Sequence, residues 1–277
     1  MFVFVELALA SDQQPEQTAL PVMIAAVSRD AIGGLGPSRR TKSGIVEAEP
    51  LAFLSPSGEW QALPCKPGTG EGCKKFAREY LSKKHTYKVI SADGIGATVH
   101  APPVTLSECF GYSGDGTYSG ARIEKSAIAA SSSDIFAPPT PPRIVTASEA
   151  TAIRRALRPL VPKRLDTVED LRIMPLQLES TDLLIVQRAY ADNIDPKNFI
   201  RKYVFMIGRI EEGQFHVLQT KKNMDDEEER VLGTIRMKNG KEFLITTVSD
   251  PESQLFRVYG VRDAHVVLVF QGGGSSC

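Results

Sequence analysis

The sequence predicts an α+β protein dominated by β-strands: a small N-terminal α+β module, then an antiparallel β-meander, folded as a sheet or sandwich, with one capping helix. Three observations predict this class. Short apolar or alternating segments recur between residues 171 and 270, joined by short polar turns. A helix-capping sequence begins at Thr146. A stretch rich in Ser and Pro separates the two parts.

Four segments follow from this division. We interpret residues 1–20 as the end of a signal peptide followed by a disordered segment, with a short N-terminal β-strand as the alternative to the signal peptide. Residues 21–130 are the small module, residues 131–143 a linker and residues 144–277 the meander domain. Consecutive prolines between Pro138 and Pro142 favour an extended spacer without packed structure.

The N-terminal module is predicted from hairpins and one short helix. Strands are expected at 21–28, 51–54, 59–63, 87–90 and 97–99, and a third hairpin is expected from strands 108–112 and 117–123. Asp93-Gly94 and Gly114-Asp115-Gly116 are the expected turns of the second and third hairpins. After Cys73, Phe76 and Tyr80 fall on one face of a predicted helix.

The meander domain begins with a helix. Thr146 and Glu149 form a capping box, and Ala150, Ile153 and Leu157 make an apolar face. The opposite face and the residues after it are basic, which is typical of a solvated surface; binding of phosphate or nucleic acid is the alternative. These basic residues are Arg154, Arg155, Arg158, Lys163 and Arg164.

Eight strands are expected after the helix. Residues 171–178 should form an edge strand, since Pro175 has no N–H to donate to a neighbour. Residues 203–207 and 266–270 are apolar without alternation, so both faces of these strands should be covered. The strands are predicted at 171–178, 183–190, 202–210, 215–220, 231–237, 242–248, 255–259 and 266–270.

The segment 231–270 resembles a degenerate FG-GAP-type propeller repeat. The glycine turn of that family matches Asn239-Gly240, whereas Arg236 and Lys238 occupy the region where the family carries calcium-binding aspartates. The resemblance implies an extracellular β-repeat origin without calcium binding.

Several functional classes lack their signatures. Lys and Arg total 33 and Asp and Glu total 33, so no net charge favours nucleic acid. No apolar run reaches the ~20 residues that cross a bilayer as a helix. Arg39 replaces the third glycine of a dinucleotide-binding loop, and we expect no cofactor. We assign no catalytic or metal-binding residue: the acidic run 225–229 is interpreted as a solvated hairpin tip, and His216 and His265 as structural.

The cysteines favour export. Cys65 and Cys73 flank a Gly-rich loop and are predicted to form a disulfide, and the even total of four suits an oxidising compartment. Cys109 and Cys277 remain as a second pair, although four cysteines allow three pairings. We therefore expect a secreted or periplasmic protein. A cytoplasmic protein with free thiols is the alternative.

These observations predict a non-enzymatic binding or scaffolding module with a protein or saccharide partner. The alternative is an exported hydrolase, which a pocket joining His100 or His216 to a carboxylate and a serine would favour. Trp60, Tyr112 and Tyr118 are the ligand-binding candidates, with core packing as their alternative role.

Overall fold

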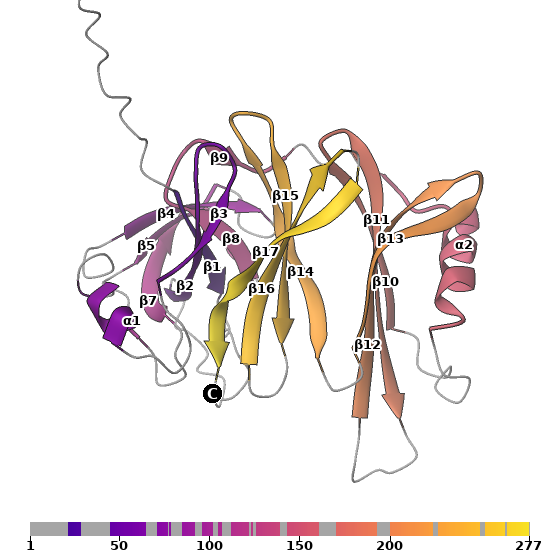
Figure 1. The fold of residues 1–277 in the computed structure, drawn as a ribbon. Helices are drawn as coiled ribbons and strands as arrows, with labels where there is room; N and C mark the ends of the chain where they lie inside the picture. The colour runs from indigo at the N-terminus through magenta and orange to yellow at the C-terminus, as the bar shows by residue number, and fades with distance from the viewer. Residues whose placement is uncertain are drawn as a thin grey trace, which may run out of the picture.

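The computed structural model consists of β-sheets stacked in layers. It describes residues 22–28, 45–64, 71–76, 78, 85–91, 96–101, 105–106, 112–121, 123, 126–138, 143–160, 170–192, 200–223, 227–249, 253–263 and 265–276. From left to right in Figure 1 lie an eight-stranded sheet, a five-stranded sheet, a four-stranded sheet and helix α2 (Ala147–Leu157). The predicted β-dominated α+β class is confirmed.

The N-terminal sheet closes into a barrel-like arrangement that the sequence did not predict. Strand β2 (Ile45–Leu54) pairs with β1 along much of its length and with β7 near its start, which joins β2, β1, β8, β4, β5 and β7 into a ring. Small side chains such as Ala25, Ala48 and Ala127 help fill the interior and suit the narrow barrel. The other elements are β1 (Val22–Ser28), β3 (Trp60–Ala62), α1 (Glu71–Phe76), β4 (His85–Ser91), β5 (Thr98–Ala101), β6 (Thr105–Leu106), β7 (Tyr112–Ser119) and β8 (Ser126–Ala130).

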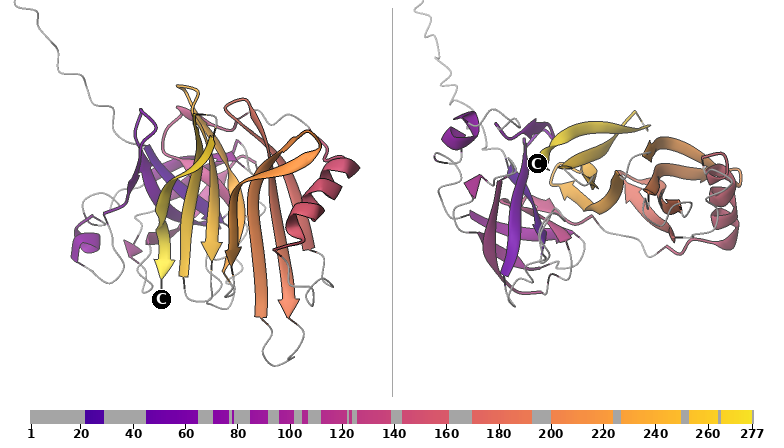
Figure 2. Two further views of the ribbon diagram at one scale, coloured as in Figure 1. Left: turned by 45° about the vertical axis from the view of Figure 1, so that its right-hand side comes forward. Right: turned by 90° about the horizontal axis from the view of Figure 1, so that it is seen from below.

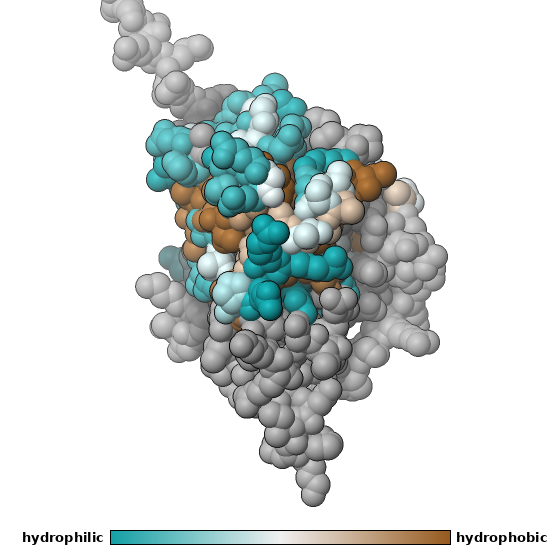
Figure 3. All heavy atoms as spheres, turned by 90° about the vertical axis from the view of Figure 1, so that its right-hand side faces the viewer, coloured by the Kyte–Doolittle hydropathy of each residue, from teal (hydrophilic) through white to brown (hydrophobic). Residues whose placement is uncertain are grey.

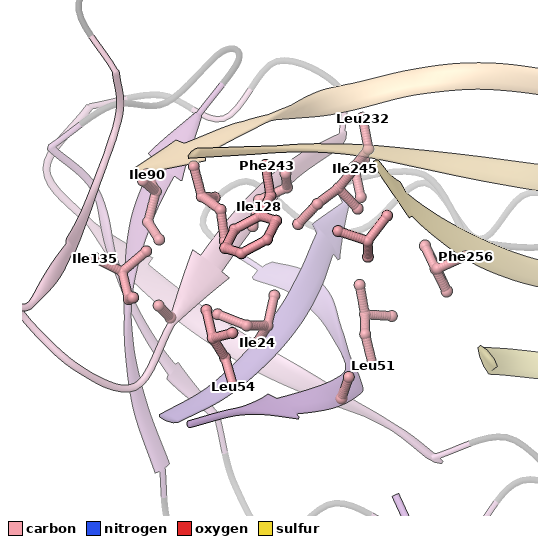
Figure 4. Packing of buried hydrophobic residues seen from close by; sticks show 14 of the residues in the cluster. Ile24, Leu51, Leu54, Ile90, Ile128, Ile135, Leu232, Phe243, Ile245 and Phe256 are labelled. Carbon is pink, nitrogen blue, oxygen red and sulfur yellow. The ribbon is translucent and has the colours of Figure 1, made fainter. Parts of the chain in front are cut away.

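One face of the five-stranded sheet packs on the outside of the barrel. Ile24 and Ile128 of the barrel and Ile245 and Phe256 of the sheet belong to one buried cluster (Figure 4). The two predicted modules therefore share a core. The sheet contains, in spatial order, β17 (His265–Ser276), β16 (Ser253–Arg262), β15 (Glu242–Ser249), β14 (Glu228–Met237) and β9 (Ile135–Phe136).

The four-stranded sheet is covered on both faces. Within β12, Val204 and Met206 pack toward α2, whereas Phe205 and Ile207 pack toward the five-stranded sheet. This confirms the prediction for residues 203–207, and the two sheets with α2 outside them are visible end-on in Figure 2. The order is β10 (Asp170–Leu178), β11 (Thr181–Asp192), β12 (Ile200–Glu211) and β13 (Gln214–Asn223), which places Pro175 on an edge as expected.

Helix α2 begins with the predicted capping box. The N–H of Glu149 donates to Thr146 Oγ1 at 3.2 Å, and the N–H of Thr146 donates to Glu149 Oε2 at 2.9 Å. Ile153 and Leu157 are fully buried against the four-stranded sheet. Figure 3 shows the side of the molecule that carries this helix, where hydrophilic areas adjoin hydrophobic patches. The helix arginines Arg154, Arg155 and Arg158 are exposed.

Three local predictions were wrong. Gly114-Asp115-Gly116 is not a turn but part of β7, because pairing with residues 46–48 of β2 holds it extended. The predicted linker contains β9, in which Ile135 is buried and pairs with Met237. Residues 266–270 are not covered throughout, since Leu268 is 45 % exposed.

Gly208 marks a bulge between β12 and β13 where the strands approach closely. A Cβ atom there would lie 2.4 Å from the His216 carbonyl oxygen and 2.5 Å from Phe215 Cζ. We expect Gly208→Ala to lower the free energy of unfolding by about 1–3 kcal/mol in urea titrations, because backbone must move. Gly260→Ala should lower the free energy of unfolding by less, because the nearest atoms there are side-chain carbons at 3.3 Å. A larger decrease for Gly260→Ala than for Gly208→Ala would contradict the close approach of the strands at Gly208.

Candidate functional site

A polar groove lies where the turns of two hairpins meet. The turn between β10 and β11 supplies Glu179 and Ser180, and the hairpin of β14 and β15 supplies residues from both its strands and its turn. The groove has a volume of about 420 Å³. Its principal lining side chains are Gln177, Glu179, Ser180, Arg236, Lys241 and Glu242.

The first turn has an uncommon backbone conformation. Glu179 and Ser180 have φ angles of 46° and 69°, so two consecutive non-glycine residues occupy the left-handed region. A tight hairpin requires this geometry, but Asn and Gly adopt it more easily than Glu and Ser. Such conformations persist where surrounding contacts hold them, and they are enriched at functional sites.

Glu242 holds this turn in place. The Glu179 N–H donates to Glu242 Oε2 at 2.7 Å, and the Glu242 N–H donates to Glu179 Oε1 at 3.3 Å. Arg236 Nε lies 3.6 Å from Glu242 Oε1 on the same wall. The two carboxylates thus bind backbone of the opposite hairpin and fix the width of the groove.

The second turn is also fastened to the barrel. Asn239 Nδ2 donates to the Pro56 carbonyl oxygen at 3.0 Å, and Lys241 Nζ donates to the Ser57 carbonyl oxygen at 2.6 Å. Pro56 and Ser57 lie in the turn between β2 and β3, whose predicted hairpin is confirmed by the register Leu54 to Trp60. Three hairpin tips are therefore joined around the groove.

A second polar cluster is buried farther along the same face of the five-stranded sheet. Glu229, whose side chain has no exposed surface, accepts from Arg257 Nη1 at 2.6 Å. Its other oxygen accepts from Thr246 Oγ1 at 2.7 Å and from the Tyr259 hydroxyl at 2.8 Å. Burial and the negative charge of Glu229 raise the pKa of Tyr259, so its hydroxyl remains a donor.

This cluster has a structural role. Each oxygen of Glu229 is paired, and Arg257 also donates to Gln271 Oε1 at 3.0 Å. The adjoining cavity, with a volume of about 20 Å³, is the size of a single water site. The prediction that residues 225–229 form a solvated tip is wrong at Glu229, because Arg257 compensates its burial; residues 225 and 226 lie outside the described part of the chain.

Glu49 is a third buried acid, on β2. Its side chain faces the same side as Ala26, toward the five-stranded sheet, and in the described part of the structure Oε1 has no hydrogen-bond partner. Burial, and then the negative charge of Glu47, raise the pKa of Glu49 from 4.5 to about 8.

The raised pKa of Glu49 predicts a pH-dependent stability. Between about pH 4.5 and pH 8 the folded protein holds a proton at Glu49 that the unfolded chain has lost, so the free energy of unfolding falls as the pH rises and levels off above pH 8. The slope from one group is at most about 1.4 kcal/mol per pH unit. We expect Glu49→Gln to lose this slope in urea titrations from pH 5 to pH 8, becoming more stable than the wild type at pH 8.

The exposed residue Glu59 is the matched control for this titration. Glu59→Gln should keep the wild-type slope. An unchanged slope in Glu49→Gln would show that Glu49 ionises normally in the folded protein.

The aromatic residues singled out from sequence lie apart from the groove. Tyr112 is buried in the barrel core, and Tyr118 packs partly buried against it. Trp60 lies between barrel and sheet, with ring centroids 5.5 Å from Phe243 and 5.9 Å from Phe270. The structure places all three in packing contacts, the alternative role considered for them.

The cysteine predictions and the signal-peptide interpretation fall on residues outside the described set. Residues 1–20, Cys65, Cys109 and Cys277 all lie outside that set, and for Cys73 only the backbone within α1 is described. The disulfide therefore stays a prediction.

The histidines do not line the groove. His216 Nε2 lies 3.9 Å from Glu211 Oε2 with its side chain 49 % exposed, and His100 Nδ1 lies 3.4 Å from Thr86 Oγ1. His216 and His265 lie in strands β13 and β17, as predicted, and both are exposed. Among the residues described, no group of three His, Cys, Asp or Glu side chains could hold a metal ion.

Comparisons with known proteins supply no relative. No family model, no curated protein and no solved structure matches the chain, and the resemblance of residues 231–270 to a propeller repeat gains no support. Within the described residues, no helix has both the length and the apolar character needed to span a membrane.

Proposed function

We propose that the chain is a non-enzymatic binding module of an exported protein and that the polar groove between the hairpin tips is its ligand site. The observation that carries this proposal is the groove itself. Its volume of about 420 Å³ falls within the range of small-molecule sites, roughly 300–1,000 Å³. Its walls are joined by the reciprocal hydrogen bonds of Glu179 and Glu242.

A pre-formed wall favours binding over a role in packing alone. The left-handed turn at Glu179 and Ser180 is held by Glu242, and the facing turn is held by the contacts of Asn239 and Lys241 to the barrel. A site whose walls are already ordered loses little conformational entropy when a ligand binds. The lining is hydrophilic, so the ligand should be a polar small molecule or the polar end of a saccharide or peptide.

Thermal unfolding tests this role. A panel of neutral and charged monosaccharides and N-acetylated amino acids at millimolar concentration should contain members that raise the melting temperature, since a ligand of the folded state stabilises by mass action. Arg236→Gln, within the groove, should abolish the shift, and Arg262→Gln, an exposed arginine elsewhere, should retain it. Equal shifts in both variants would place binding outside the groove.

The proposal of export rests on the four cysteines and on the apolar N-terminal segment. Thiol titration of denatured protein expressed in the periplasm tests it. Fewer than four reactive thiols, rising to four after reduction, are expected. Four free thiols before reduction would contradict export.

A further inference from the structure

We infer that the groove takes a small hydrophilic monocarboxylate, an inference that rests on the proposed binding function. The polar groups of the groove differ in whether they already have hydrogen-bond partners. One oxygen each of Glu179 and Glu242 accepts a backbone N–H of the opposite hairpin. The Glu242 side chain is only 9 % exposed, so it belongs to the wall rather than to the open space.

The cationic groups, by contrast, have donors to spare. Arg236 is 41 % exposed, and its nearest anionic contact is Nε to Glu242 at 3.6 Å, beyond hydrogen-bond distance. No hydrogen bond from its guanidinium to another described residue occurs, although this group carries five N–H donors. Lys241 uses one of three donors on Ser57, and Ser180 contributes a hydroxyl.

This surplus of donors selects an acceptor-rich ligand. A guanidinium matches the two oxygens of a carboxylate in a bidentate pair, which is stronger and more directional than a neutral hydrogen bond. A ligand ammonium would face Arg236 and Lys241, and the carboxylates that could attract it, Glu179 and Glu242, each already accept a backbone N–H of the opposite hairpin. The site therefore favours an anion over a cation.

The charge balance of the groove limits that anion to a single charge. Arg236 and Lys241 together offset Glu179 and Glu242, so the lining has no net formal charge. A phosphate dianion or a polyanion would meet the repulsion of both carboxylates within a few ångströms, whereas a monocarboxylate can pair with Arg236 alone. The carboxylate is thus the better match.

The rest of the ligand should be polar as well. The groove is larger than a carboxylate, and the remainder of its lining is Gln177, Ser180, Asn239 and Gly240, without an aromatic or aliphatic side chain. Hydroxyl or amide groups would find partners there. A uronic acid and the end of a peptide both offer this chemistry.

Two matched series of probes distinguish a saccharide carboxylate from the carboxylate end of a peptide. Methyl glucuronide and methyl glucoside differ only by the carboxylate on a sugar ring, and glucosamine supplies a cation; N-acetylglycine and its amide form the peptide pair. Binding is measured by changes in the NMR signals of the Arg236 side-chain Nε–H and of the Ser180 and Gly240 amides. At least one carboxylate should bind about tenfold or more tightly than its neutral partner, as expected for a charge-assisted contact.

Variants assign the effect to Arg236. Arg236→Gln should weaken carboxylate binding by about tenfold or more while Arg262→Gln leaves it unchanged. Binding of the neutral or cationic probe at these signals with equal affinity would overturn the ligand class and leave the binding function intact. If no groove signal moves with any probe, both the ligand class and the proposed function are wrong.

Discussion

Replacing Glu229 by glutamine is expected to lower the free energy of unfolding by about 3–5 kcal/mol, since removing one partner of a buried ion pair leaves the other charge uncompensated. Arg257, 4 % exposed in its side chain, would keep its hydrogen bond to Gln271 and the 3.3 Å contact to Glu227, whose side chain is 32 % exposed. Urea titration of the variant measures the loss.

A neighbouring acid provides the control. Glu228 pairs with Arg230, whose side chain is 60 % exposed, and surface pairs contribute about 0–1 kcal/mol. Glu228→Gln should therefore change stability little. A double variant, Glu229→Gln with Arg257→Met, should recover part of the loss because it removes the unpaired charge as well. Similar losses for Glu228→Gln and Glu229→Gln would show that the buried cluster has no special role.

Phe243→Ala is expected to lower the free energy of unfolding by about as much as Glu229→Gln. Phe243 is buried between barrel and five-stranded sheet, where its ring meets Trp60 edge to face. Truncating a large buried aromatic typically costs about 3–5 kcal/mol through lost burial and the cavity that remains. Urea titration of this variant therefore measures how strongly the interface between the two parts contributes to stability.

Phe136 offers a matched comparison on the edge strand β9, where it is 40 % exposed. Phe136→Ala should lose much less stability than Phe243→Ala. Equal losses would mean that the barrel and the sheet are held together by something other than their shared core.

Local patterns predicted most of the meander. The lack of alternation in residues 203–207 signalled a strand covered on both faces, and the structure supplies α2 on one side and the five-stranded sheet on the other. Thr146 and Glu149 signalled the start of α2. Such features depend on neighbours within a few residues, so sequence spacing contains them.

Closure of the barrel depends on long-range pairing instead. Gly114 to Gly116 have the composition of a turn, but their partners in β2 lie far away in sequence, at 46–48, and hold them extended. Ile135 likewise forms β9 because Met237 is available as a partner. No pattern of neighbouring residues predicts either contact.

The sequence did not predict the groove or the buried Glu229 cluster, because both also depend on long-range contacts. Asn239-Gly240 was recognised as a turn, but the hydrogen bonds that build the groove join residues 63 apart in sequence. Glu229 stands in an acidic run that resembles a solvated loop, and only the position of Arg257 across the sheet shows that it is buried. Glu242 likewise begins the apolar strand β15, and a charged residue at that position is equally typical of an exposed strand end.

We expect the barrel and the two C-terminal sheets to unfold as one body, since the groove depends on hairpin tips fastened to both. Trp60, the sole tryptophan, lies at their interface and reports on it directly. Urea unfolding followed by Trp60 fluorescence and by far-ultraviolet circular dichroism should give a single coincident transition. A Trp60 transition at lower urea, with β-sheet signal retained, would contradict the claim.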